Sequence, residues 1–103
     1  MFLWVKGRAY FTLGDYPKAI KALAESVRVR PNLWFTQAWL AAAYALVDRR
    51  PEARKALTPF RKKFPQYNLA RITKYYKEEQ YRNPTLEAAS AQLLSGLRKA
   101  GLE

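Results

Sequence analysis

Residues 9–23, AYFTLGDYPKAIKAL, recur 34 positions further along the chain as residues 43–57, AYALVDRRPEARKAL. Seven of these fifteen positions are identical, and Pro31 pairs with Pro65 at the same offset. Self-similarity at a fixed period of this length is typical of repeat proteins, in which each unit is a small supersecondary structure that packs on the next. The repeat therefore indicates the architecture before any single residue is considered.

Each period divides into two predicted helices separated by a turn. We expect helices over about 2–13 and from Asp15 to about Val29 in the first period. Gly14 can adopt the left-handed conformation that ends a helix, and Asp15 can cap the helix that follows. Pro31 then prevents continuation. The second period predicts helices over 33–47 and 51–63 in the same way.

The third unit keeps the hairpin pattern but loses the register of the repeat. Helices are expected over 68–81 and 84–99, with Asn83-Pro84 starting the second of them and Gly101 ending it. A terminal repeat is expected to be atypical, because one of its faces meets water instead of a neighbour. We therefore predict one all-α domain of six helices over 1–103, with units 1–33, 34–67 and 68–103, the last serving as a C-terminal cap.

The residues at fixed positions of the two regular units resemble the tetratricopeptide repeat. Its motif positions hold Leu3, Lys6, Gly7, Tyr10, Ala19, Leu23 and Pro31 in the first unit, and Gln37, Leu40, Ala41, Tyr44, Ala53, Leu57 and Pro65 in the second. Leu3 and Gln37 depart from the usual aromatic residue, and Lys6 departs from the usual Leu. The resemblance implies a right-handed superhelix of helical hairpins whose concave groove binds a peptide or protein, as a scaffold does.

The tail shows a second, narrower resemblance. Residues 81–84 (YRNP) and 96–102 (GLRKAGL) are similar to the C-terminal repeat regions of bacterial proteins that carry a class III adenylate cyclase domain or a winged-helix DNA-binding domain. This implies that the chain is the C-terminal part of a larger bacterial regulatory protein. No catalytic residue can be carried over, because the metal-binding aspartates of such cyclases lie in a different domain.

The tetratricopeptide resemblance also implies which residues line the groove, because the first helix of each hairpin faces it. By position they are Trp4, Arg8, Phe11, Thr12, Phe35, Ala38, Ala42, Leu46, Leu69, Ile72, Tyr76 and Gln80. Trp4, Arg8 and Phe11 are the expected central contacts. The alternative for aromatic residues at helical spacing is a place in the core, and it is the more frequent outcome for Trp34, Phe35 and Trp39. Arg8 and Ala42 occupy the positions where a carboxylate clamp has Asn, so recognition of chaperone tails is not expected.

Charge is the most extreme property of the composition. Nineteen Lys and Arg against eight Asp and Glu give a net charge of +11, which favours anionic partners. Ten of these cations lie between Arg49 and Lys77, where Glu52 is the only acid. A basic patch is predicted on the helix that begins at Pro51, formed by Arg54, Lys55, Arg61 and Lys62. Nucleic-acid binding through this patch is one interpretation, and an ordinary solvated helix face is the other.

Several classes of function are not expected from the composition. The chain has no Cys and no His, so thiolate chemistry, the commonest general base and the commonest metal ligands are missing. We therefore predict no enzyme activity and no cofactor or metal. No signal peptide or membrane-spanning run is recognisable, which predicts a cytoplasmic location without membrane contact. The apolar start of the first hairpin leaves self-association into a homodimer as a further alternative.

Overall fold

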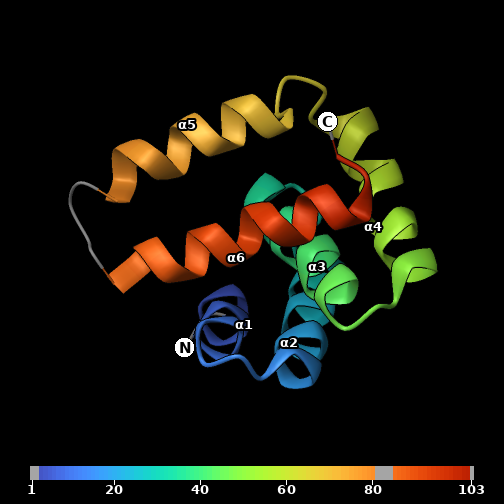
Figure 1. The fold of residues 1–103 in the computed structure, drawn as a ribbon. Helices are drawn as coiled ribbons and strands as arrows, with labels where there is room; N and C mark the ends of the chain where they lie inside the picture. Colours follow the sequence, from blue (N-terminus) through green and yellow to red (C-terminus); the bar gives the residue numbers. More distant parts are fainter. Residues whose placement is uncertain (1–2, 81–84, 103) are drawn as a thin grey trace.

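The computed structural model describes residues 3–80 and 85–102, with side chains placed for 3–78 and 88–102 (Figure 1). These residues form six helices and no strand. The helices are α1 (Leu3–Thr12), α2 (Tyr16–Val29), α3 (Trp34–Leu46), α4 (Arg50–Lys63), α5 (Leu69–Gln80) and α6 (Thr85–Ala100). The prediction of an all-helical chain with six helices is confirmed, and most helix ends lie within one residue of their expected positions. The expected Asn83-Pro84 helix start lies outside the described residues.

The turns inside the first two hairpins are built alike, as the repeat predicts. Gly14 ends α1 with φ of +82°, and the N–H of Asp15 donates to the Tyr10 carbonyl at 2.9 Å. At the same place in the second hairpin, Asp48 has φ of +59° and the N–H of Arg49 donates to the Tyr44 carbonyl at 2.9 Å. These bonds satisfy carbonyl groups that a helix end would otherwise leave unpaired.

The start of the second helix differs between the two hairpins. The Asp15 carboxylate accepts a hydrogen bond from the N–H of Lys18 at 3.3 Å, as expected of a cap. Arg49 stands at the equivalent position and makes no side-chain capping bond. The second hairpin therefore has the same backbone turn without the side-chain chemistry that supports it in the first.

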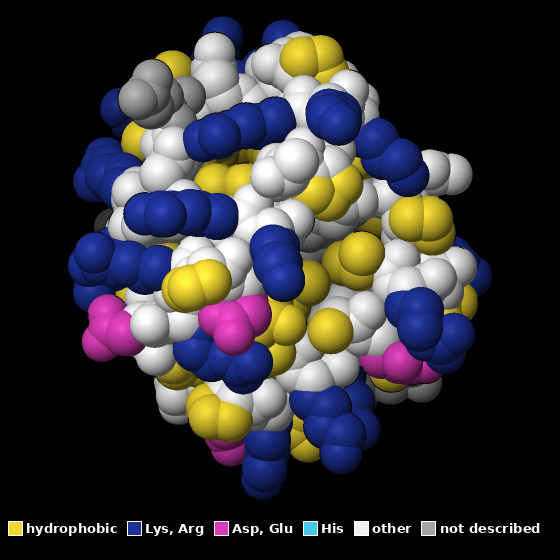
Figure 2. All heavy atoms as spheres, turned by 90° about the vertical axis from the view of Figure 1, so that its right-hand side faces the viewer, with side chains coloured by type: hydrophobic (Ala, Val, Ile, Leu, Met, Phe, Trp, Pro, Cys, Tyr) yellow, Lys and Arg dark blue, Asp and Glu magenta, His cyan; other side chains and the backbone are white. Residues whose placement is uncertain are grey.

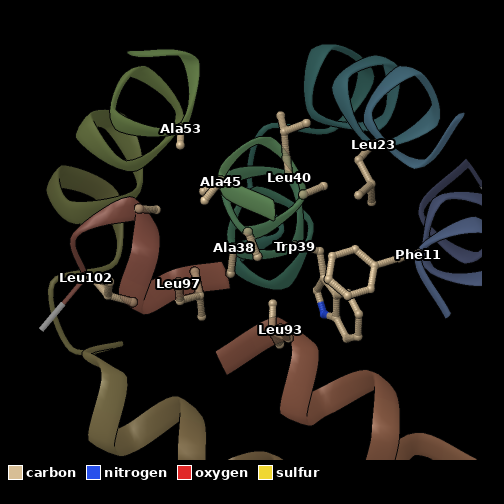
Figure 3. Packing of buried hydrophobic residues seen from close by; sticks show 14 of the residues in the cluster. Phe11, Leu23, Ala38, Trp39, Leu40, Ala45, Ala53, Leu93, Leu97 and Leu102 are labelled. Carbon is tan, nitrogen blue, oxygen red and sulfur yellow. The ribbon is translucent and has the colours of Figure 1, made fainter. Parts of the chain in front are cut away.

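Helix α3 lies at the centre of the molecule, packed against α2, α4 and α6 and touching α1. Most of its residues are buried, including a run of alanines at 38, 41, 42, 43 and 45 that are fully inaccessible. Small side chains allow neighbouring helices to approach closely from several directions. The core therefore surrounds α3 instead of lying between two layers (Figure 3).

Helix α6 runs across α3, between α5 on one side and α1 on the other (Figure 1). Its buried face holds Leu93, Leu97 and Ala100, and Figure 3 shows Leu93 and Leu97 pointing toward α3. A Cβ on Gly96 would lie 2.7 Å from the Ala42 carbonyl oxygen, so the two helix backbones are in direct contact there. A regular stack of hairpins places the first helix of the third unit against α3. Here the second helix, α6, takes that place, because the third unit has left the register of the repeat.

Candidate binding surface

The centre of the groove expected from the sequence is filled by the protein's own last helix. Ala38 and Ala42 are fully buried, with Gly96 of α6 against Ala42. Phe11, Ile72 and Tyr76 are buried as well, with 3% or less of each side chain exposed. The expectation that these five residues line an open groove is therefore corrected. They are core residues, because α6 covers the face of α3 that an open solenoid would expose.

The buried aromatic residues of this region are joined by one polar contact. The Trp39 indole N–H donates to the Tyr76 hydroxyl at 2.8 Å, across the interface between α3 and α5. The Phe11 ring meets Trp39 edge-on, with ring centroids 4.6 Å apart. The hydrogen bond gives the indole N–H a partner inside the core, which removes the cost of burying it unpaired. The ring contact thus joins α1 to α3, and the hydrogen bond joins α3 to α5.

Other groove residues from the sequence remain accessible. Trp4, Arg8, Phe35, Leu46 and Leu69 are half-buried and Thr12 is exposed. Thr12 donates its hydroxyl to the Arg8 carbonyl of its own helix, so its polar group is already satisfied. Leu46 is the last residue of α3, at the opposite end of the helix from Phe35. The side chain of Gln80 lies outside the described residues.

Trp4, Arg8, Trp34 and Phe35 form a group of half-buried side chains that we call the Trp4 cluster. The Trp4 ring meets Phe35 edge-on at 5.0 Å, and Phe35 meets Trp34 edge-on at 5.9 Å. The Arg8 guanidinium lies over the Trp39 ring at 5.8 Å, one turn along α1 from Trp4. The structure thus brings Trp4 and Phe35 of the expected groove together with Trp34, and Arg8 lies one turn along α1. The sequence favoured the core for Trp34 and Phe35, and both pack against it.

The aromatic contacts continue from Trp34 toward α5. Trp34 stacks on Tyr67 with ring centroids 4.2 Å apart and planes 10° apart, and meets Tyr75 edge-on at 5.3 Å. Tyr75 has 46% of its surface exposed. Tyr67 was not singled out by the sequence pattern, because it lies in the linker before α5 and the helical period does not apply to it. Tyr75 was not singled out either, because its contact with Trp34 joins residues far apart in the chain. A turn residue in contact with a helix start leaves no periodic signal.

The basic residues predicted on α4 are all on the surface. Arg54, Lys55, Arg61 and Lys62 are exposed, and Figure 2 shows Lys and Arg spread over the side of the molecule that carries α4, with acidic side chains at several places among them. Arg61 donates to the Gly101 carbonyl at 2.5 Å, which ties α4 to the end of α6. Within the described part of the chain, Arg54, Lys55 and Lys62 have no ion-pair partner.

Among the described residues, one ion pair has shifted pKa values. The Arg28 guanidinium donates to the Glu25 carboxylate and lowers the pKa of Glu25, but this pair is on the surface. Among the described residues, no three acidic side chains lie close enough to hold a metal ion. Likewise, no helix in the described part of the chain is long and apolar enough to cross a membrane.

Comparison of the chain with protein-family models, with curated proteins and with solved structures finds no match.

Proposed function

We propose that this chain is a non-catalytic interaction module of the tetratricopeptide type, which binds a protein or peptide partner at the Trp4 cluster. The observation that carries the proposal is the set of linked, half-buried rings of Trp4, Trp34 and Phe35 at the starts of α1 and α3. Trp and Arg are the residues that most often supply binding energy at protein interfaces. Two Trp and one Arg are available in this one place.

The packing of the cluster suits a binding surface. Each ring is held by an edge contact with its neighbour, so little side-chain freedom remains to be lost when a partner binds. Most of each side chain is buried, and Trp34 and Phe35 pack against the core, which holds the rings in place. Arg8 adds a cation beside the apolar surface and favours a partner with an acidic or carbonyl-rich edge.

The position of α6 limits how a partner can bind. An extended peptide cannot lie along the whole of α3, because Ala38 and Ala42 are beneath α6. A partner at the Trp4 cluster contacts the N-terminal ends of α1 and α3, together with Arg8 one turn further along α1. We therefore propose a short anchor segment with one or two large apolar side chains, bound across these two helix ends, in place of a long peptide filling a groove.

The alternative of self-association through the first hairpin receives less support. A shallow hollow on this hairpin is lined by Leu3, Lys6, Tyr10, Lys18, Lys21, Ala22 and Glu25. Three lysines against one glutamate would repel the same face of a second copy. The charge of this surface favours an acidic neighbour over a homodimer.

The proposal is tested by affinity capture from the source cell with the full chain as bait, followed by mass spectrometry. Trp4→Ala is compared with Leu13→Ala, which also removes an apolar side chain but from a site 79% exposed and outside the cluster. We expect Trp4→Ala to lose partners that wild type and Leu13→Ala both retain, with unchanged helical circular dichroism. The same set of partners for all three proteins would show that the Trp4 cluster is not the binding site.

A further inference from the structure

Two shallow hollows adjoin each other on the surface that carries the end of α4 and the start of α5. One is lined by Arg61, Phe64, Pro65, Tyr67, Asn68 and Leu102, and the other by Asn68, Ala70, Arg71, Lys74, Tyr75 and Glu78. Asn68 lies between them and belongs to both. We call this pair of hollows the Asn68 track. None of its residues belongs to the Trp4 cluster.

Each hollow combines an aromatic ring with cationic side chains. Arg61 and Tyr67 are in the first hollow, and Arg71, Lys74 and Tyr75 are in the second. Both hollows therefore place positive charge beside an aromatic ring. Proteins that bind single-stranded nucleic acid without sequence preference use this combination, in which cations follow the phosphates and bases stack on rings.

The rings and cations of the track are held in position by their neighbours. Tyr67 is backed by the parallel ring of Trp34 at 4.2 Å, and the Arg71 guanidinium lies over Tyr67 at 5.5 Å. The backbone N–H of Arg71 donates to the Asn68 side chain at 2.8 Å, which caps the start of α5. Tyr75 meets Trp34 edge-on and still exposes 46% of its surface. Tyr75 is thus a ring held by its neighbours, with nearly half of the residue exposed.

The surrounding charge favours a polyanion. Arg71 and Lys74 lie one turn apart on α5, and the exposed Arg54, Lys55 and Lys62 of the predicted basic patch are on α4, the helix that ends at the first hollow. Glu78 is the one acid that lines either hollow. An acidic peptide could pair with these cations, but its carboxylates are repelled by the negative face of the Tyr75 ring. A single-stranded nucleic acid satisfies both the cations and the ring.

We propose that the Asn68 track binds single-stranded nucleic acid, with phosphates at Arg61, Arg71 and Lys74 and a base stacked on Tyr75. The contacts involve backbone charge and ring stacking, so binding is independent of base sequence. This activity is separate from the proposed protein binding at the Trp4 cluster, and either can fail without the other.

The test measures fluorescence anisotropy of a labelled oligothymidylate of about ten nucleotides against the full chain at several salt concentrations. We expect the logarithm of the affinity to fall linearly with the logarithm of salt, with a slope of about −2 for three phosphate contacts. Tyr75→Ala should weaken binding about fivefold or more, whereas Tyr75→Phe should preserve it. Both substitutions are at a partly exposed position, so circular dichroism should remain unchanged.

A matched pair of charge reversals separates the track from the overall charge of +11. Lys74→Glu and Lys21→Glu change the net charge equally at two exposed lysines, but Lys21 is on α2. We expect Lys74→Glu to weaken binding clearly more than Lys21→Glu, and to make the salt slope shallower by about 0.7. Equal losses for the two variants would overturn the proposal, because binding would then depend on net charge alone.

Two further probes identify the chemistry of the ligand. If polyglutamate binds as tightly as the oligothymidylate, and if Tyr75→Ala weakens both equally, the site binds acidic peptides and the nucleic-acid assignment is overturned. A DNA duplex of the same length that binds equally well would show that no base stacks on Tyr75, which also overturns it. Preference for the single strand that disappears in Tyr75→Ala supports the proposal. Trp4→Ala should leave this binding unchanged.

Discussion

The contact between Gly96 and Ala42 allows a quantitative prediction for Gly96→Ala. A Cβ at position 96 would lie 2.7 Å from both the carbonyl oxygen and the Cβ of Ala42, and 2.8 Å from its Cα. Ordinary contact begins at 3.4 Å, so α6 has to withdraw from α3 by about 0.7 Å. These obstructing atoms belong to backbone or to a Cβ and cannot rotate away. Leu93 and Leu97, which are fully buried on the same face of α6, then lose part of their packing.

We expect the free energy of unfolding to fall by about 1–2 kcal/mol in Gly96→Ala. Overpacking of a close contact costs roughly 1–3 kcal/mol, and the better helix propensity of Ala returns about 0.5–1 kcal/mol. Urea unfolding followed by circular dichroism measures the change, provided that the m-value is unaffected. Ala91→Gly is the control, because residue 91 is an exposed position of the same helix and reports propensity alone.

If Gly96→Ala raises the free energy of unfolding by as much as Ala91→Gly lowers it, then the contact between α3 and α6 does not oppose a Cβ at position 96, and the explanation is refuted.

Gly7→Ala offers a second comparison. A Cβ at Gly7 would lie 2.6 Å from Leu23, but the two nearest atoms there belong to a side chain. The second repeat accommodates Ala41 at the equivalent position opposite Leu57. Gly7→Ala should therefore destabilise less than Gly96→Ala.

Three more substitutions probe the turns and the core. Asp48→Gly should raise the free energy of unfolding by about 0.5–1 kcal/mol in urea, because Gly adopts the left-handed conformation more readily and because the carboxylate at the negative C-terminal end of α3 is removed. Gly14→Ala should lower the free energy of unfolding for the first of these reasons. Asp15→Ala should cost about 1 kcal/mol through loss of the α2 cap, and an equal cost for Arg49→Ala, where no such bond exists, would contradict this explanation. Tyr76→Phe should cost about 1–3 kcal/mol in thermal unfolding, since the buried Trp39 N–H loses its acceptor, and an unchanged melting temperature would contradict the importance of that hydrogen bond.

The positions where helices begin and end could be predicted from the sequence, because local residues determine them. Gly14, Asp15 and Pro31 each act through their own backbone conformation or through groups within a few residues, so their effects do not depend on distant packing. The repeat also predicted a break between the two helices of the second hairpin. The turn found there at Asp48 matches the turn at Gly14, although Asp takes the left-handed conformation less readily. The number of helices and their approximate bounds follow from such signals alone.

The candidate binding surface could be predicted only in part. The resemblance to a known repeat brought Trp4, Arg8 and Phe35 to attention, and these side chains remain accessible. It also selected Phe11, Ala38 and Ala42, which the structure buries. Burial depends on which element covers a helix face, and the 34-residue period carries no information about α6 because the third unit has lost it. Tyr67 and Tyr75 gain their role only by contact with Trp34, more than 30 residues away in the chain.

The sequence by itself thus determined the helices, the hairpin turns and the basic character of this protein, because these depend on local backbone preferences and on composition. Only the tertiary structure shows that α6 crosses α3 at Gly96 and Ala42. Because α6 lies there, it covers the centre of the expected groove. The physical reason is close packing. Gly96 and the alanines of α3 are small enough to let two helix backbones meet, but small residues specify how near a neighbour can come and not which neighbour it will be.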